Sequence, residues 1–170
     1  LATILGTFQA SLTNIKRLRP KWVHNTEEEA LLGVSLTGIM DNAFMNGGSE
    51  DRGFYGKRSL PDFLSDLRKE SVKTNEHWSE LLGIQQATAT TAIKPSGTVS
   101  QLVDSASGIH TRHSDYYIRR VRADAKDPIA QLMEDQGIPA EADVMKPNSV
   151  KVFSFPMKAP EGAVTRNERN

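Results

Sequence analysis

The sequence predicts an α/β protein whose strands are mainly parallel. Segments with helical spacing of apolar residues alternate along the chain with segments rich in β-branched residues. Helix-start and helix-stop residues separate these segments, and no repeat, low-complexity stretch or Ser/Gly linker interrupts them. We therefore expect residues 1–170 to form one section of a domain without an internal boundary.

The first half of the chain begins with a helical stripe formed by Ile4, Phe8, Leu12 and Ile15, which we expect Pro20 to end. Thr26 and Glu29 have the spacing of a capping box and predict a short helix. Residues 31–40 then indicate a buried strand or extended segment. The Gly-rich residues 41–58 indicate a loop with a short helical turn.

A second long helix is predicted to start at Ser59, with Pro61 and Asp62 in its first turn, and to end at Gly83. A break between residues 71 and 75 is an alternative. The expected apolar side of this helix consists of Leu60, Phe63, Leu64, Leu67, Trp78, Leu81 and Leu82. Residues 86–93 then predict a strand, because β-branched side chains dominate them.

The last part of the chain contains two further predicted strands with a helix between them. Residues 114–123 and 149–158 are the strands, and Pro156 is expected to stop the second. The helix has Asp127 as its cap, Pro128 at its first position and Gly137 at its end.

The composition of the chain disfavours or excludes several classes of function. Lys plus Arg and Asp plus Glu each number 21 in the 170 residues, so the net charge is zero and bulk electrostatic binding to nucleic acid is disfavoured. No run of about 18 apolar residues predicts a membrane span, and no signal peptide is apparent. The chain contains no cysteine, which excludes disulfides and a cysteine nucleophile within it. We expect a cytoplasmic protein with neither a membrane nor a nucleic acid as partner.

The segment AIKPSGTVSQL, residues 92–102, has the composition of a phosphate-binding turn. A strand leads through Gly97 into a short helix, whose first N–H groups lack intrahelical partners. Ser96, Thr98 and Ser100 offer hydroxyl groups, and Lys94 offers a positive charge. The segment matches neither the Walker A pattern nor G-x-G-x-x-G, so an ordinary turn with a Ser or Thr cap is the alternative.

Other candidate sites carry weaker patterns. His110 and His113 have ligand chemistry, but no cysteine or H-E-x-x-H pattern accompanies them, and we expect no metal site. A Ser/His/Asp hydrolase assembled from Ser100, His113 and Asp104 lacks the G-x-S-x-G elbow. Asp41 and the acids at residues 49–52 are more typical of a solvated loop than of a catalytic pair.

The strand at residues 114–123 is rich in arginine and tyrosine. Arg119, Arg120 and Arg122 beside Tyr116 and Tyr117 have the chemistry to contact phosphates or single-stranded nucleic acid. A strand that alternates between a packed face and a solvated face is the favoured interpretation.

Five ordered segments together are more specific than any single motif. These segments, ATILGTFQASLTNIKRLRPKW, EEEALLGVSLTGIMD, TNEHWSELLGI, ATATTAIKPSGTVSQLVDSASGIHTRHSDYYIRRVR and VFSFPMKAPEGAVTR, resemble adenosylcobalamin-dependent (class II) ribonucleotide reductases of the monomeric ribonucleoside-triphosphate reductase type. The resemblance implies part of the ten-stranded α/β barrel of the reductase catalytic chains. It also implies that the segment formed by Lys94, Pro95, Ser96, Gly97, Thr98, Val99 and Ser100 binds the phosphates of a ribonucleotide substrate.

The resemblance further implies a radical enzyme. In that family adenosylcobalamin generates a thiyl radical on a cysteine, and a cysteine pair, re-reduced by an external thiol reductant such as thioredoxin, supplies electrons. The family's NPCGE motif and its reducing cysteines are absent here, and Thr111 and Asp115 stand where the family has proline.

We therefore expect a section of the second half of the barrel. It would be inactive alone, contain no catalytic residue and depend on the remainder of the reductase chain. A non-catalytic piece of a split reductase and a phosphate- or RNA-binding module are the alternatives. The sequence leaves open whether the substrate is a diphosphate or a triphosphate.

Overall fold

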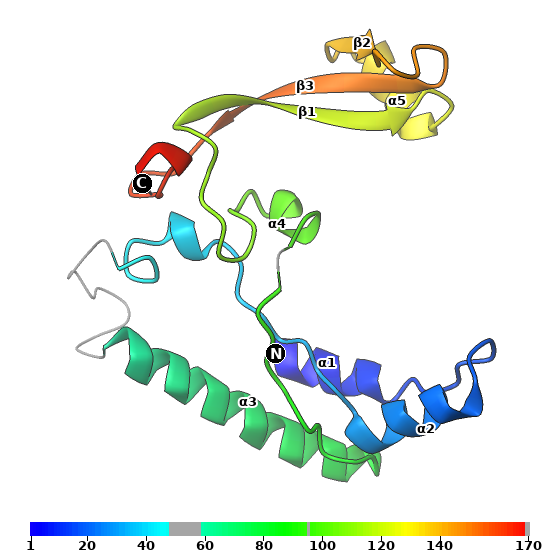
Figure 1. Ribbon diagram of the computed structural model, residues 1–170, viewed down its shortest axis with the longest axis vertical. Coiled ribbons are helices and arrows are strands. Elements are labelled where there is room, and N and C mark those ends of the chain that lie inside the picture. The colour runs from blue at the N-terminus through cyan, green and yellow to red at the C-terminus, as the bar shows by residue number, and fades with distance from the viewer. Residues whose placement is uncertain (48–58, 95, 169–170) are drawn as a thin grey trace. The chain divides into compact units, whose positions relative to one another are not determined.

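The computed structural model describes residues 1–47, 59–94 and 96–168 (Figure 1). The chain divides into two compact units, residues 1–111 and residues 112–170. The expectation that residues 1–170 form one barrel section without an internal boundary stays a prediction.

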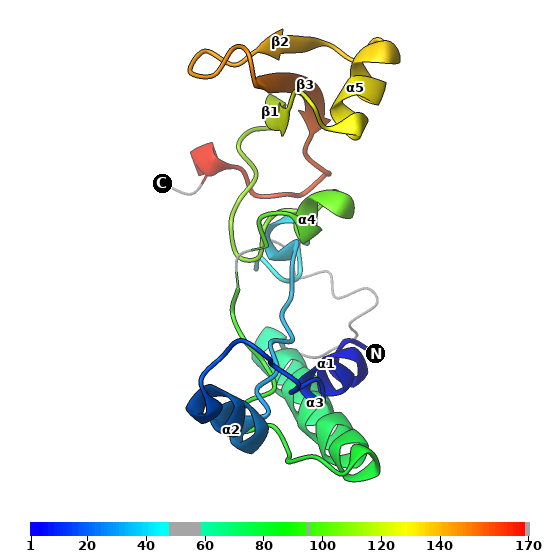
Figure 2. The ribbon, with the colours of Figure 1, turned by 90° about the vertical axis from the view of Figure 1, so that its right-hand side faces the viewer.

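The first unit is helical, with α1 (Ala2–Ala10), α2 (Pro20–Glu29), η1 (Ile39–Asp41), α3 (Leu60–Leu82) and α4 (Val99–Leu102) (Figure 2). Two sequence predictions about its start are wrong. Pro20 begins α2 and does not end the first helix, since a proline nitrogen needs no partner at a first helical position. Thr26 lies inside α2, where its hydroxyl donates to the Trp22 carbonyl at 2.7 Å and so forms no capping box.

Helix α3 confirms its predicted start and end. Ser59 caps it, with its Oγ accepting the Asp62 N–H at 3.3 Å. Gly83 ends it in the left-handed conformation at φ +66°, which glycine adopts without a steric penalty. The helix is continuous through residues 71–75, so the alternative of a break there is wrong.

The buried face of α3 is polar, which the sequence analysis did not predict. Ser71, Asn75 and Ser79 are the buried residues of this helix. The expected apolar side is largely open, with Leu64, Leu67 and Leu81 exposed. Ser71 and Asn75 hydrogen-bond to Thr90 of an extended segment and to Thr7 of α1, so the polar face of α3 is the face that packs against these segments.

Two extended segments of the first unit pair in parallel. The N–H groups of Leu32 and Val34 donate to the carbonyls of Ala89 and Thr90 at 2.9 and 3.1 Å, and the Ala92 N–H donates to Val34 at 3.0 Å. Between these two described segments the structure has one isolated β-bridge, Val34↔Thr91, and no continuous strand pair. Residues 86–93 are therefore an extended segment and not the predicted strand. Residues 31–40 were expected to be a buried strand or an extended segment; they are extended as far as η1, which begins at Ile39, and they are only partly buried.

The second unit contains a three-stranded sheet. Its strands are β1 (Tyr116–Asp124), β2 (Ala140–Ala142) and β3 (Val150–Lys158), in the order β1-β3-β2. All its pairings are antiparallel, so the expectation of mainly parallel strands is wrong for this sheet. Helix α5 (Pro128–Asp135) has the predicted cap, with the Asp127 carboxylate accepting the Ile129 N–H at 2.8 Å, and η3 (Arg166–Glu168) lies near the chain's end. Val152 and Phe153 of β3, together with Ala130 of α5, are almost fully buried.

Pro156 lies inside β3, opposite Ile118, and does not stop the strand. The register explains how a proline fits there. Strand β2 pairs only with residues 151–153 of β3, and the Ser154 N–H points to the same side, toward the Pro139 carbonyl. Two residues further on, the Pro156 nitrogen faces that side beyond the end of β2, where no ladder hydrogen bond is lost.

Candidate functional site

The predicted phosphate-binding segment lies in the first unit and runs from the end of the paired segment at Ala92 into the first turn of helix α4. Lys94, Gly97, Thr98 and Val99 are exposed, Ser96 is half-buried and Ser100 is fully buried. Pro95 lies outside the described residues. Five of the seven predicted residues are therefore accessible at least in part.

Two serines of the segment form hydrogen bonds with backbone groups of the same segment. The Ser100 N–H donates to Ser96 Oγ at 2.8 Å, and the Ser100 hydroxyl donates to the Ser96 carbonyl in a very short hydrogen bond. This is a capping arrangement around the first turn of α4. Ser96 and Ser100 thus shape the turn, and the Thr98 side chain makes no capping hydrogen bond.

The backbone at Gly97 is open. A Cβ added at Gly97 would meet no other atom within 4 Å, and no hydrogen bond within the described residues uses the N–H groups of Gly97 or Thr98. These two donors, the Thr98 hydroxyl and the Lys94 ammonium are the groups that this turn offers to an anion. Helix α4 has only four residues, so individual N–H groups contribute more here than a helix dipole.

A second segment of the chain supports the turn after α4. The Ser105 N–H donates to the Ser100 carbonyl at 2.8 Å. The Ala106 N–H donates to an Asp41 carboxylate oxygen at 2.6 Å, and the Ala106 carbonyl accepts the Gly38 N–H at 2.7 Å. Gly38 has φ +69°, and a Cβ there would lie 3.1 Å from the Ser105 Cβ. Glycine is therefore required where these two segments meet.

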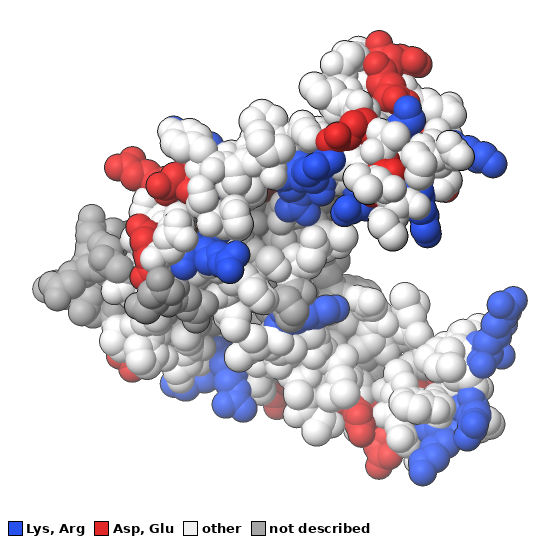
Figure 3. All heavy atoms as spheres, turned by 45° about the horizontal axis from the view of Figure 1, so that its top comes forward, with Lys and Arg blue, Asp and Glu red and all other residues white. Residues whose placement is uncertain are grey.

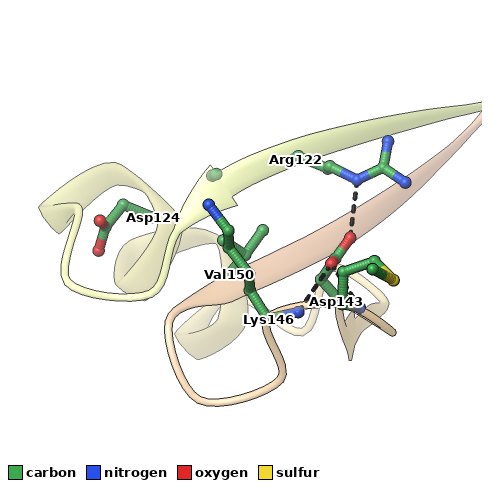
Figure 4. Close-up of a pocket in the computed structure, with 7 residues that line it drawn as sticks. Arg122, Asp124, Asp143, Lys146 and Val150 are labelled. Carbon is green, nitrogen blue, oxygen red and sulfur yellow. Dashed lines mark hydrogen bonds and ion pairs between the residues drawn. The ribbon is translucent and has the colours of Figure 1, made fainter.

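Two of the three arginines of β1 are paired with acids. Arg120 forms an ion pair with Glu141, and Arg122 Nε donates to Asp143 Oδ2 at 2.7 Å (Figure 4). The Arg122 hydrogen bond, followed by the Met145 N–H, lowers the pKa of Asp143 below its ordinary value of 3.8. These contacts neutralise two of the three arginines that were considered for phosphate or nucleic-acid binding.

The histidine candidates make local contacts. A His110 ring nitrogen, Nδ1, lies 2.9 Å from the Ser107 carbonyl, and the His113 ring lies 6.0 Å from the Tyr117 ring. Among the residues with described positions, no group of three His, Cys, Asp or Glu could hold a metal ion. In the same part of the chain, no helix is both long enough and apolar enough to cross a membrane.

Sequence reasoning missed Asn75. Its side-chain oxygen accepts the Ala87 N–H at 2.9 Å, at the start of the segment that leads to the turn. The sequence does contain a pattern that indicates a polar buried face. Ser71, Asn75 and Ser79 recur at four-residue intervals and so share one face of the helix.

Comparison with solved structures places the fold in the class of ribonucleotide reductases. The chain matches a crystal structure of a B-12 dependent (class II) ribonucleotide reductase with a TM-score of 0.68 and 23% identity, covering 97% of this chain and 26% of that one. The helices, extended segments and small sheet fit an α/β fold. No protein-family model matches the chain.

Sequence relatives identify the particular family. The chain is 30% identical over 145 residues to the adenosylcobalamin-dependent ribonucleoside-triphosphate reductase of Lactobacillus leichmannii, and 36% identical over 93 residues to that of Levilactobacillus brevis. These matches cover 75% and 55% of this chain, but the chain spans only 19% and 12% of the relatives' lengths. The resemblance to adenosylcobalamin-dependent ribonucleoside-triphosphate reductases is therefore confirmed.

Proposed function

We propose that this chain is a section of the catalytic barrel of an adenosylcobalamin-dependent ribonucleoside-triphosphate reductase, and that residues 94–100 bind the phosphates of its substrate. The observation that carries the proposal is the open backbone at Gly97 and Thr98, beside exposed Lys94. Unpaired N–H groups at the start of a helix, together with a lysine, suit a phosphate oxygen.

The turn would act by binding and orientation. The N–H groups of Gly97 and Thr98 would donate to one phosphate, and Lys94 would offset the charge of the polyphosphate. Holding the phosphates fixes the ribose relative to the radical centre, which lowers the entropic part of the barrier. The Ser96–Ser100 hydrogen bonds keep the turn in shape before the substrate arrives.

The radical chemistry would take place on other parts of the reductase chain. No residue of this chain is a cysteine, so none can form the thiyl radical or the reducing pair that the family requires. Adenosylcobalamin would generate the radical in the complete enzyme. We assign no cobalamin contact to the described residues of this chain.

The proposal predicts an order of effects in the complete reductase chain. Gly97→Val blocks the approach of a phosphate, whereas a Cβ at this position meets nothing within 4 Å beyond the neighbouring residues, so the change should weaken binding of a ribonucleoside triphosphate strongly and should disturb the fold little. Thr98→Ala should cost about 1 kcal/mol of binding, the usual value of one hydrogen bond. Ser96→Ala removes the oxygen that accepts the Ser100 N–H, so it should lower the stability of the turn by about 1 kcal/mol and weaken binding only indirectly.

Titration calorimetry with CTP and with cytidine measures these effects. Gly33→Val is the matched control, because Gly33 is also exposed and a Cβ there also meets nothing within 4 Å. Cytidine binding should respond little to any of the variants. If Gly97→Val bound CTP as tightly as the unchanged protein, the phosphate assignment would be overturned.

A further inference from the structure

We infer that Asn75 of α3 is a positioning residue for the phosphate-binding turn, an inference that rests on the function proposed above. Asn75 is 3% exposed and lies on the polar face of α3. Its side chain joins α1 to the extended segment that leads into residues 94–100.

The side-chain oxygen and nitrogen of Asn75 contact two different segments of the chain. Oδ1 accepts the N–H of Ala87 at 2.9 Å, which holds the start of the extended segment. Nδ2 donates to Thr7 Oγ1 at 3.0 Å, and the Thr7 hydroxyl donates in turn to the Thr3 carbonyl at 2.9 Å. One amide group therefore satisfies both a backbone donor and a buried hydroxyl, and a side chain without an acceptor would leave the Ala87 N–H unpaired.

A second contact holds the same segment one helical turn earlier along α3. The hydroxyls of Ser71 and Thr90 lie 2.9 Å apart, and Ser71 also donates to the Arg68 carbonyl. Both Ser71 and Thr90 are 6% exposed. The extended segment is thus fixed to α3 at Ala87 and at Thr90, only four residues before Lys94.

The other side of the segment is held by backbone hydrogen bonds to residues 32–34. Beyond Ala92, no hydrogen bond holds Ile93 or Lys94 within the described residues. The path of the chain into the turn is therefore set by the anchors before it. Loosening the Ala87 anchor should let the Gly97 and Thr98 donors sample more orientations, which weakens a multi-point contact such as phosphate binding more than it weakens the fold.

The contacts provide variants that separate positioning from stability. Asn75→Leu has a similar size and removes both hydrogen bonds. Asn75→Asp keeps an oxygen that accepts the Ala87 N–H. Thr7→Val removes only the partner on α1, so it perturbs the same buried cluster without touching the extended segment.

The experiment uses the complete reductase chain, with CTP and cytidine as probes and urea unfolding as the measure of stability. Asn75→Leu should raise the CTP dissociation constant about tenfold relative to cytidine and should speed amide hydrogen exchange in residues 87–100. Asn75→Asp and Thr7→Val should lower stability, yet they should keep the preference for CTP within about twofold of the unchanged protein.

Three other outcomes would overturn the inference, and one of them would also overturn the proposed function. If the unchanged protein prefers CTP over cytidine and Asn75→Leu keeps that preference in full, the positioning role is wrong and the phosphate function stands. If Thr7→Val loses the preference as much as Asn75→Leu, Asn75 acts through general stability and the inference also falls. If the unchanged protein binds CTP no better than cytidine, the phosphate function itself fails, and the inference fails with it.

Discussion

At the scale of single residues, the sequence predicts which chemical groups a segment offers but not which of them hydrogen-bond to each other. The residue types at positions 94–100 were sufficient to predict a turn that could bind phosphate. The sequence did not show that Ser96 and Ser100 bond to each other while Gly97 and Thr98 stay open. Caps and ligand-binding groups use the same residue types, so only the geometry separates them.

Asp143 gives a prediction at the same scale. Its carboxylate accepts the Arg122 hydrogen bond and the N–H groups of Met145 and Lys146, and its pKa is lowered from 3.8. A carboxyl group whose pKa is lower in the folded state stabilises the fold fully above its unfolded pKa, and this contribution is lost as the pH falls through the folded pKa. Asp143→Asn should therefore destabilise the second unit at neutral pH and should flatten the loss of stability below pH 3.8.

Urea unfolding followed across that pH range measures the effect. Asp135→Asn, a change at an exposed acid of the same unit, controls for the altered net charge. A loss of stability that is the same at neutral and at acid pH would show that the Arg122–Asp143 contact has no part in the pH dependence.

At the scale of elements, the caps of the two clearest helices were predicted, whereas the roles of Pro20, Thr26 and Pro156 and the packing of α3 were not. The Ser59 cap, the Gly83 end and the Asp127 cap were all predicted, because they depend on neighbours within a few residues. The buried face of α3 was predicted as leucine-rich, but the structure buries Ser71, Asn75 and Ser79. Which face of a helix packs inward depends on distant segments, here α1 and residues 87–90.

The start of α3 supplies a prediction for an element. Ser59→Ala removes the oxygen that accepts the Asp62 N–H, so the first turn should fray and stability should fall by about 1 kcal/mol. Ser59→Thr keeps the acceptor and also the hydroxyl that donates to Asp62 Oδ2 at 2.6 Å, so it should retain most of that stability. Hydrogen exchange at residues 60–63 together with urea unfolding measures both variants, and equal exchange rates in Ser59→Ala and the unchanged protein would contradict a capping role.

The whole molecule exposes many large apolar side chains. Ile93, Leu102, Val144 and Met145 are each at least 85% exposed, and uncharged surface covers much of the face in Figure 3. Strand β1 also pairs on only one side among the described strands. Such surfaces and open strand edges favour association.

We therefore expect the isolated 170-residue chain to self-associate. Sedimentation velocity over a range of protein concentrations measures this directly. The average molar mass of the sedimenting species should increase with protein concentration. A monomer that unfolds in one sharp, highly stable transition would contradict the view that these surfaces pack against further parts of a reductase chain.

We propose that residues 94–100 bind the phosphates of a ribonucleotide, and a structure of the complete reductase chain with bound CTP would test this. We expect phosphate oxygens within about 3 Å of the Gly97 and Thr98 backbone nitrogens, with Lys94 turned toward the polyphosphate. A structure in which CTP is bound while its phosphates contact other segments, and in which the open side of Gly97 holds only solvent, would overturn the phosphate assignment.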